Sequence, residues 1–193
     1  MAGASHVGDA TRPEPQHRLF FALWPSEAMQ LALANAARTV LAACDGTSVP
    51  TQNLHLTLAF LGNVPASRIT ELIDIGARVA AARGDPIAVT LDRIDYWRKP
   101  QLLCATATSV APGATALAAD LKRALTESGF APDLKPFRAH ATLARKVRRV
   151  TRDRNMAPVR WSFDAFRLVE SRTAPEGSLY SSREIFGLDE MRR

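Results

Sequence analysis

The tripeptide His-x-Thr occurs twice in this chain, each time within an apolar run typical of a β-strand. The first copy spans residues 55–57, within the run 53–62, and the second spans residues 140–142, within the run 136–145. Successive side chains of a strand point to opposite faces, so each histidine shares a face with the threonine two positions on. Two such faces turned toward each other would place an acid, a base and two hydroxyl groups around one small anion.

The alternate positions of both runs are apolar. They are Leu54, Leu56, Leu58 and Phe60 in the first run and Phe137, Ala139, Ala141 and Leu143 in the second. We expect this back face to pack on the core and the front face to carry His55 with Thr57, and His140 with Thr142. Arg138 shares the front face of the second run and is a candidate phosphate ligand. Arg145 falls on the opposite face if the alternation persists, where it would pack on the outside or close the strand.

Length and composition allow one domain, or two small lobes on a shared core. The chain has 193 residues, of which 47% are hydrophobic, and a formal charge of +6 that suits a polyanionic partner. The two cysteines, Cys44 and Cys104, have no metal-like spacing and form no disulfide framework, so we expect reduced thiols.

No apolar run approaches the roughly 20 residues that a membrane span needs. Residues 1–17 are small, polar and proline-containing, and lack the apolar core of a secretory signal. We expect a disordered tail over this segment. We also expect a cytoplasmic location and a monomer.

Apolar periodicity and helix-terminating residues predict the other elements. The expected helices run from Ser26 to Ala43, after Pro65, and from Pro112 to Gly129. Further strands are expected over residues 19–24, 87–96, 102–108, 161–169 and 178–186. A helix, a His-x-Thr strand and two later strands occur in each half, which indicates a weak internal duplication. This order predicts an α+β protein with two lobes and mainly antiparallel sheets, in a single domain over residues 18–193.

Several kinds of chemistry compete for the two histidines. A single strand histidine is more often structural, but the repeated tripeptide at corresponding places favours a function. No carboxylate or cysteine stands at ligand spacing, which disfavours a metal site, and the Gly-x-Ser-x-Gly and Gly-rich phosphate-loop patterns are missing from the sequence. Imidazole has a pKa near 6.5, so one copy can accept a proton while the other donates one. The chemistry that remains is acid–base catalysis on a phosphate. It needs no cofactor and no metal if the substrate is a strained cyclic phosphate.

The segments around both copies resemble the two-histidine (2H) phosphoesterase superfamily. Within it they are similar to the RNA 2′,3′-cyclic phosphodiesterases, a family earlier named 2′-5′ RNA ligases. The resemblance extends over nearly all of the chain after the tail and is carried by residues 18–25, 53–62 and 135–145 together with Ser171, Gly177 and Tyr180. Many relatives are expected to have proline where this chain has Ala139, a departure that removes no chemical group.

The resemblance implies a bilobal fold whose two sheets face each other across a central cleft, with helices outside and pseudo-two-fold symmetry. It implies hydrolysis of RNA ends that carry a 2′,3′-cyclic phosphate to 2′-phosphomonoesters. His55 would then donate a proton to the leaving 3′ oxygen, and His140 would accept one from the attacking water. Thr57 and Thr142 would bind the phosphate oxygens.

Two features leave alternatives open. The basic run at residues 145–154 could receive an RNA backbone or be an ordinary solvated loop. Tyr96, Trp97 and Tyr180 could stack on a base or pack in the protein. Rival functions are a phosphodiesterase for small cyclic nucleotides and a non-catalytic module that binds nucleotides or RNA.

Overall fold

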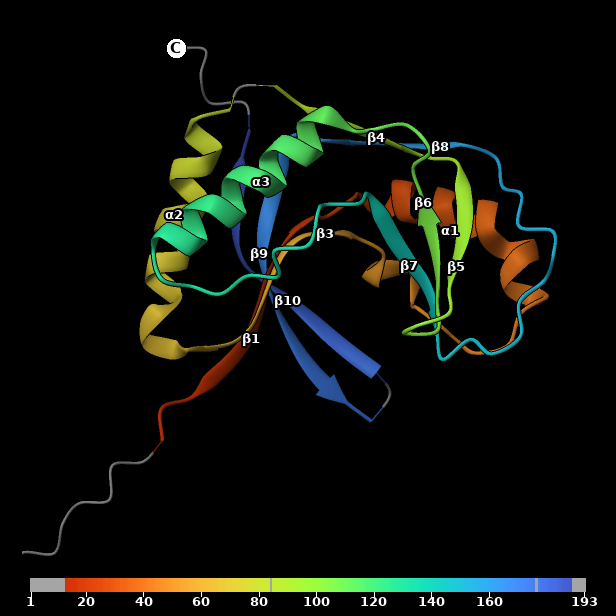
Figure 1. The fold of residues 1–193 in the computed structure, drawn as a ribbon, viewed down its shortest axis with the longest axis horizontal. Coiled ribbons are helices and arrows are strands. Elements are labelled where there is room, and N and C mark those ends of the chain that lie inside the picture. Colours follow the sequence, from red (N-terminus) through yellow and green to blue (C-terminus); the bar gives the residue numbers. More distant parts are fainter. Residues whose placement is uncertain (1–12, 84, 176, 189–193) are drawn as a thin grey trace, which may run out of the picture.

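A computed structural model describes residues 13–83, 85–175 and 177–188. Within these ranges the strands form antiparallel sheets (Figure 1). The first sheet has the order β10-β9-β1-β3 and comprises β1 (Gln16–Leu23), β3 (Leu56–Pro65), β9 (Ala165–Ala174) and β10 (Gly177–Gly187). The second has the order β2-β7-β6-β5 and comprises β2 (Thr47–Ser48), β5 (Arg93–Trp97), β6 (Leu102–Thr106) and β7 (His140–Arg145). A separate pair joins β4 (Ile87–Leu91) and β8 (Val159–Phe163).

Helices cover the outer side of each four-stranded sheet, which confirms the bilobal α+β prediction. The helices are α1 (Glu27–Ala42), α2 (Ile69–Ala81) and α3 (Pro112–Glu127), with short 3₁₀ turns at Thr51–Asn53 and Ala66–Arg68. α2 and α3 pack against each other and on the first sheet, whereas α1 packs on β7 and β8 (Figure 1). The first sheet takes strands from both ends of the chain, so the lobes are interwoven and one hydrophobic cluster extends through both.

The helix boundaries follow the predicted signals. The Ser26 hydroxyl accepts a hydrogen bond from the Met29 amide and caps α1. Pro112 occupies the first turn of α3, and Gly129 follows its end with φ of +72°, a conformation that favours glycine. None of the described helices combines the length and apolarity that a membrane crossing requires.

Two predicted strands are wrong as single elements. Residues 87–96 divide at Asp92 into β4 and β5, and residues 161–169 divide at Asp164 into β8 and β9. In both cases the second strand joins a different sheet, because β4 and β8 pair only with each other. Apolar residues occur on both sides of each bend, which made each segment resemble one strand. The buried positions are three apart across the bend, from Leu91 to Ile94 and from Phe163 to Phe166, so the alternation changes face at the aspartate between them.

The first strand also begins earlier than expected. Gln16 and His17, placed in the expected tail, belong to β1, and the His17 imidazole lies 2.9 Å from a carboxylate oxygen of Glu170. Residues 1–12 of that tail lie outside the described part of the chain.

Gly76 provides a test of the packing between α2 and the first sheet. A Cβ atom at this position would overlap the ring of Phe186 on β10. That ring has little room to turn, because it is 5% exposed and stacks on Phe166 with ring centroids 4.9 Å apart. We predict that Gly76→Ala lowers the free energy of unfolding by about 1–3 kcal/mol in urea titrations. This loss would occur although alanine is intrinsically the better helix former by about 1 kcal/mol.

Gly187→Ala is the matched control, because no atom lies within 4 Å of the Cβ it would add. We expect its unfolding midpoint to match that of the unaltered protein. An unchanged or raised midpoint for Gly76→Ala would contradict the close contact with Phe186.

Candidate active site

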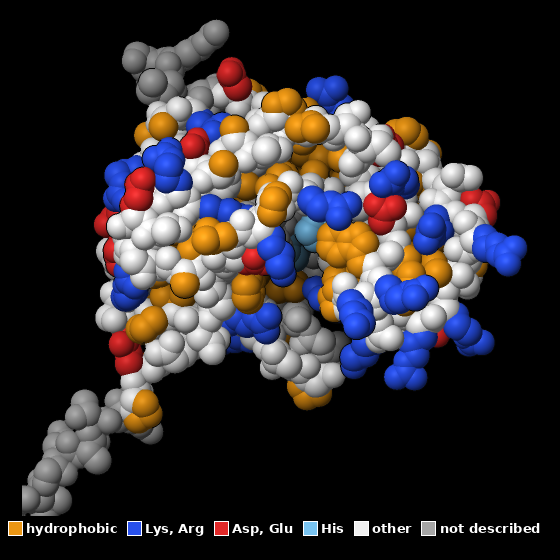
Figure 2. Space-filling model, in the orientation of Figure 1, with side chains coloured by type: hydrophobic (Ala, Val, Ile, Leu, Met, Phe, Trp, Pro, Cys, Tyr) orange, Lys and Arg blue, Asp and Glu red, His pale blue; other side chains and the backbone are white. Residues whose placement is uncertain are grey.

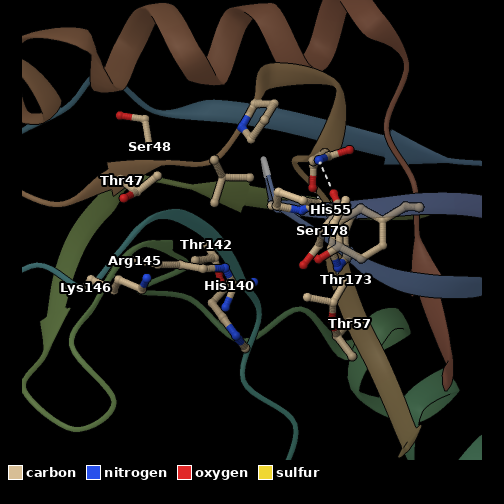
Figure 3. A pocket seen from close by; sticks show the side chains of 17 residues that line it. Thr47, Ser48, His55, Thr57, His140, Thr142, Arg145, Lys146, Thr173 and Ser178 are labelled. Atoms are coloured by element: carbon tan, nitrogen blue, oxygen red, sulfur yellow. Dashed lines mark hydrogen bonds between the residues drawn. The ribbon is translucent and has the colours of Figure 1, made fainter. Parts of the chain in front are cut away.

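Both histidines reach one cavity from different sheets. His55 directly precedes β3 of the first sheet, and His140 opens β7 of the second. Together with Thr57 and Thr142 they line a cavity of about 450 Å³ between the sheets. Figure 3 shows His140 and Thr142 on one side of this space and His55 and Thr57 on the other. The structure therefore brings together the four residues predicted from the repeated tripeptide.

The same backbone irregularity follows the threonine in both strands. In β3 the pairing with β1 passes from Thr57 to Ala59, and in β7 the pairing with β6 passes from Thr142 to Ala144. The leucine between them in each strand is left without a partner position, which is the pattern of a β-bulge. Leucine and alanine are consequently both buried in each copy, and the residues that follow are shifted to the other face.

Arg145 is the last residue of β7, as one of the two predicted alternatives had it. It lines the cavity because of this bulge, so the expectation that it would lie on the opposite face from His140 is wrong. Phe60 holds the equivalent position in the first copy and is also turned away from the predicted back face, on which Leu54, Leu56 and Leu58 are buried. The consecutive apolar pair Leu-Ala after each threonine was the signal available in the sequence. It breaks the alternation at the same place in both copies.

A common hydrogen bond orients the two imidazoles. Nδ1 of His55 lies 2.7 Å from the carbonyl oxygen of Asn53, and Nδ1 of His140 lies 2.7 Å from that of Arg138. A carbonyl only accepts, so Nδ1 carries the hydrogen in both rings and Nε2 is left to accept or donate a proton. The Thr57 hydroxyl lies 3.3 Å from Nε2 of His55 and can donate to it.

Asn53 has a second contact that joins two walls of the cavity. Its side-chain amide donates to the carbonyl oxygen of Ser178, at 3.1 Å (Figure 3, dashed line). Ser178 belongs to β10, in the hairpin that closes one side of the cavity. The residue that orients His55 is therefore also fixed to the opposite strand.

Aromatic rings enclose each imidazole. Trp24 stacks flat on His55, with centroids 4.9 Å apart and an interplanar angle of 3°. Tyr180 meets the same imidazole edge-on at 5.3 Å, and Trp97 lies 4.6 Å from His140. Trp24 was not among the predicted site residues. Tyr96 does not contact either histidine ring, and its hydroxyl donates a hydrogen bond to the Val147 carbonyl oxygen at 2.9 Å. Trp97 and Tyr180 thus contact the histidines directly, whether or not they also contact a base.

Burial lowers the pKa of both histidines. It is the largest effect on His55, whose pKa falls to about 4, and the positive charges of Arg145 and protonated His140 lower it further. The hydrogen bond to Asn53 acts in the opposite direction. Burial likewise lowers the pKa of His140, with a smaller contribution from the Arg138 charge. Both rings are therefore neutral at pH 7 before an anion binds.

The cavity offers positive charge and hydroxyl groups. Arg145 and Lys146 line it, and no aspartate or glutamate of the described residues does. Among the residues that the structure describes, no group of three or more histidine, cysteine, aspartate or glutamate residues is placed to hold a metal ion. Figure 2 shows a histidine in the hollow between the lobes, with Lys and Arg side chains around the rim. These features suit a small anion.

Arg138 is not among the residues that line this cavity. Its exposed guanidinium lies over the Trp97 ring, 5.4 Å from the centroid, and its backbone carbonyl orients His140. A direct contact of the Arg138 side chain with phosphate remains a prediction.

The beginning of the basic run is held by specific contacts. The Asp45 carboxylate accepts hydrogen bonds from the backbone amides of Arg148 and Arg149, at 2.7 and 2.8 Å. Val147 is buried, and its amide donates to the Gln101 carbonyl at 3.1 Å. The side chains of Arg148 and Arg149 are exposed, and the Arg149 guanidinium lies 3.6 Å from the same Asp45 carboxylate. The loop therefore has a fixed backbone with cationic groups at the surface.

Comparison with known proteins places this geometry among phosphoesterases. Residues 23–103 and 105–180 match the family model described as LigT like phosphoesterase. An RNA 2′,3′-cyclic phosphodiesterase of Thermus thermophilus is 31% identical over 184 residues, which cover 89% of this chain and 90% of that protein. A crystal structure of a phosphoesterase has a TM-score of 0.81 at 27% identity, covering 91% of this chain and 100% of the other. The crystal structure of Escherichia coli LigT complexed with 3′-AMP has a TM-score of 0.81 at 26% identity, covering 90% and 99%.

The low pKa of His55 can be measured by NMR. We predict that the His55 ring carbon–proton signals titrate with a midpoint near pH 4 in the free protein. Inorganic phosphate should raise this midpoint, because an anion near the ring stabilises the imidazolium. His55→Asn identifies the signal, and chloride at the same ionic strength is the control. A midpoint of 6.5 or above without phosphate would contradict the desolvated environment of His55.

Proposed function

Because the chain belongs to the LigT like phosphoesterase family, we propose that it hydrolyses 2′,3′-cyclic phosphate ends of RNA to 2′-phosphomonoesters by acid–base catalysis between His55 and His140, without a metal. The observation that carries the proposal is the pair of matched imidazoles, each oriented through Nδ1, that enter one cationic cavity from separate sheets. The name of the Thermus thermophilus relative supports the choice of substrate.

In this proposal the cyclic phosphate lies between the two Nε2 atoms. Neutral His140 accepts a proton from water as the water oxygen attacks phosphorus. Protonated His55 gives its proton to the 3′ oxygen as the bond from phosphorus to that oxygen breaks. Each of these proton transfers typically contributes about 10²- to 10⁴-fold in rate.

The groups around the two histidines would stabilise the charge that develops on the phosphate. Thr57, Thr142 and Arg145 line the cavity and would bind the non-bridging oxygens. Arg145 brings a planar fork of donors that fits two oxygens at once. Opening the strained ring releases energy. The barrier that these residues must lower is therefore smaller than the barrier for a linear phosphodiester.

The lowered pKa values suit both roles once the substrate is bound. A His140 with a low pKa is neutral at pH 7, as a base must be. A His55 with a low pKa forms a strong acid when protonated, and the anionic phosphate would raise its pKa enough for it to hold the proton. The substrate would thus supply the charge that allows the acid to form.

A phosphodiesterase for small cyclic nucleotides is the second candidate. A cavity of about 450 Å³ has the size of a small-ligand site and holds about one nucleotide. The ligand in the Escherichia coli LigT complex, 3′-AMP, is likewise a mononucleotide. Rates on a nucleoside cyclic phosphate and on an oligonucleotide with the same end would separate the two candidates.

We predict that His55→Asn and His140→Asn each lower turnover of RNA with a cyclic phosphate end by at least about 10²-fold. Asparagine retains a polar group near the carbonyl that Nδ1 contacts but cannot transfer a proton at the Nε2 position. The assay contains a chelator, and chromatography identifies the product as the 2′- or 3′-phosphate. Circular dichroism checks that both variants fold.

His17→Asn is the control, because His17 lies outside the cavity and pairs with Glu170. It should retain normal turnover. Normal turnover by either variant of the paired histidines would exclude the mechanism, and loss of all activity in chelator would exclude its independence of metal.

The pH profile tests whether one of the two histidines must be protonated and the other neutral. In the free protein His55 must be protonated and His140 neutral, and both pKa values lie below 6.5. We therefore predict that kcat/KM declines as the pH rises from 6 to 8. The decline of kcat should begin at a higher pH than the decline of kcat/KM, because bound phosphate raises the pKa of His55. A kcat/KM that is flat from pH 5 to 8 would contradict the requirement for one protonated and one neutral histidine.

A further inference from the structure

A second cavity adjoins the first across His55, Thr57 and Arg145. It measures about 320 Å³ and lies over the cavity-facing side of the first sheet. Arg18 and Ser171 line it but do not line the first cavity, while Ser178 lines both. The proposed reaction at the histidines gives this second space no role.

Arg18 provides the distinctive charge of the second cavity. Strand alternation in β1 places it on the same face as Phe20, whose ring lies 5.2 Å from that of His55. Two residues of a strand span about 7 Å, so Arg18 lies one such step farther from the histidine. Its guanidinium lies over the Phe60 ring, 5.0 Å from the centroid, and none of the described carboxylates pairs with it.

The polar groups of this space would bind an anion. Two guanidinium groups, from Arg18 and Arg145, and two hydroxyl groups, from Ser171 and Ser178, face it without any carboxylate of the described residues. Its aromatic rings are less available to a base. Phe20 already contacts His55 and Tyr180, and Phe60 lies under the Arg18 guanidinium.

Resting on the proposed function, we propose that the second cavity binds the phosphate on the 5′ side of the terminal nucleotide, with Arg18 as its principal ligand. In an RNA chain this phosphate is the anion nearest to the cyclic phosphate and is separated from it by one ribose. The nucleoside itself would occupy the larger cavity. Arg145, which lines both spaces, lies between the two phosphates.

This arrangement gives the protein a means of recognising a polynucleotide end. A nucleoside 2′,3′-cyclic phosphate would fill only the first site, whereas the same nucleoside with a 5′-phosphate would fill both. A charge-assisted hydrogen bond to phosphate is worth about 1.5–3 kcal/mol, which corresponds to a factor of about 10 or more in affinity. The preference should therefore be measurable with mononucleotides.

The test measures dissociation constants by calorimetry for adenosine 2′-phosphate and adenosine 2′,5′-bisphosphate. We expect the unaltered protein to bind the bisphosphate about tenfold more tightly. In Arg18→Gln this preference should fall to about twofold or less, and in Arg18→Lys it should be intermediate, because lysine retains the charge without the planar fork. Arg160→Gln is the matched control, because Arg160 is an exposed arginine on β8 that lines neither cavity.

No preference in the unaltered protein, or an undiminished preference in both Arg18 variants, would overturn the inference. A preference lost equally in Arg160→Gln would also overturn it, because it would indicate an effect of net charge alone. A parallel hydrolysis assay with adenosine 2′,3′-cyclic phosphate tests the proposed function separately. Failure of that reaction with the binding preference intact would refute the activity and support the second anion site.

Discussion

The site depends on the hydrogen bond from each imidazole Nδ1 to the backbone carbonyl two residues earlier. This bond, 2.7 Å long in both copies, sets the tautomer and leaves the same nitrogen free on both rings. Without it each ring could turn, and two histidines would not present a matched pair of proton-transfer atoms. The flat stack of Trp24 on His55 and the contact of Trp97 with His140 restrict the rings further and also lower their pKa values by burial.

The repeated bulge explains how a duplicated arrangement yields an unsymmetrical site. The strand after each threonine changes face at the same place, which turns the fifth residue after each histidine toward the space between the sheets. In one copy that residue is Arg145, which brings positive charge to both cavities. In the other it is Phe60, which carries the Arg18 guanidinium on its ring. One backbone feature therefore presents a cationic side chain on one side and an aromatic support on the other.

The electrostatics of the site favour an anion over a metal cation. The histidines are neutral at pH 7 in the free protein. The fixed charges of the cavity lining are those of Arg145 and Lys146, and the charge of Arg138 also acts on His140. A bound phosphate would be attracted by these charges and would in turn make protonation of His55 easier. In the proposed reaction, binding and proton transfer would thus be coupled through the same few groups.

The sequence by itself determined the two His-x-Thr pairs, their apolar back faces, the ends of the helices and the α+β class. These features depend on local periodicity, capping residues and residue type, all of which a single segment contains. The tertiary structure decided that Arg145 and Phe60 face the cavities, that residues 87–96 and 161–169 each divide between two sheets, and that Trp24 and Tyr180 enclose His55. Those outcomes depend on which strands pair and where their register shifts, and strands that are separated in the sequence set both.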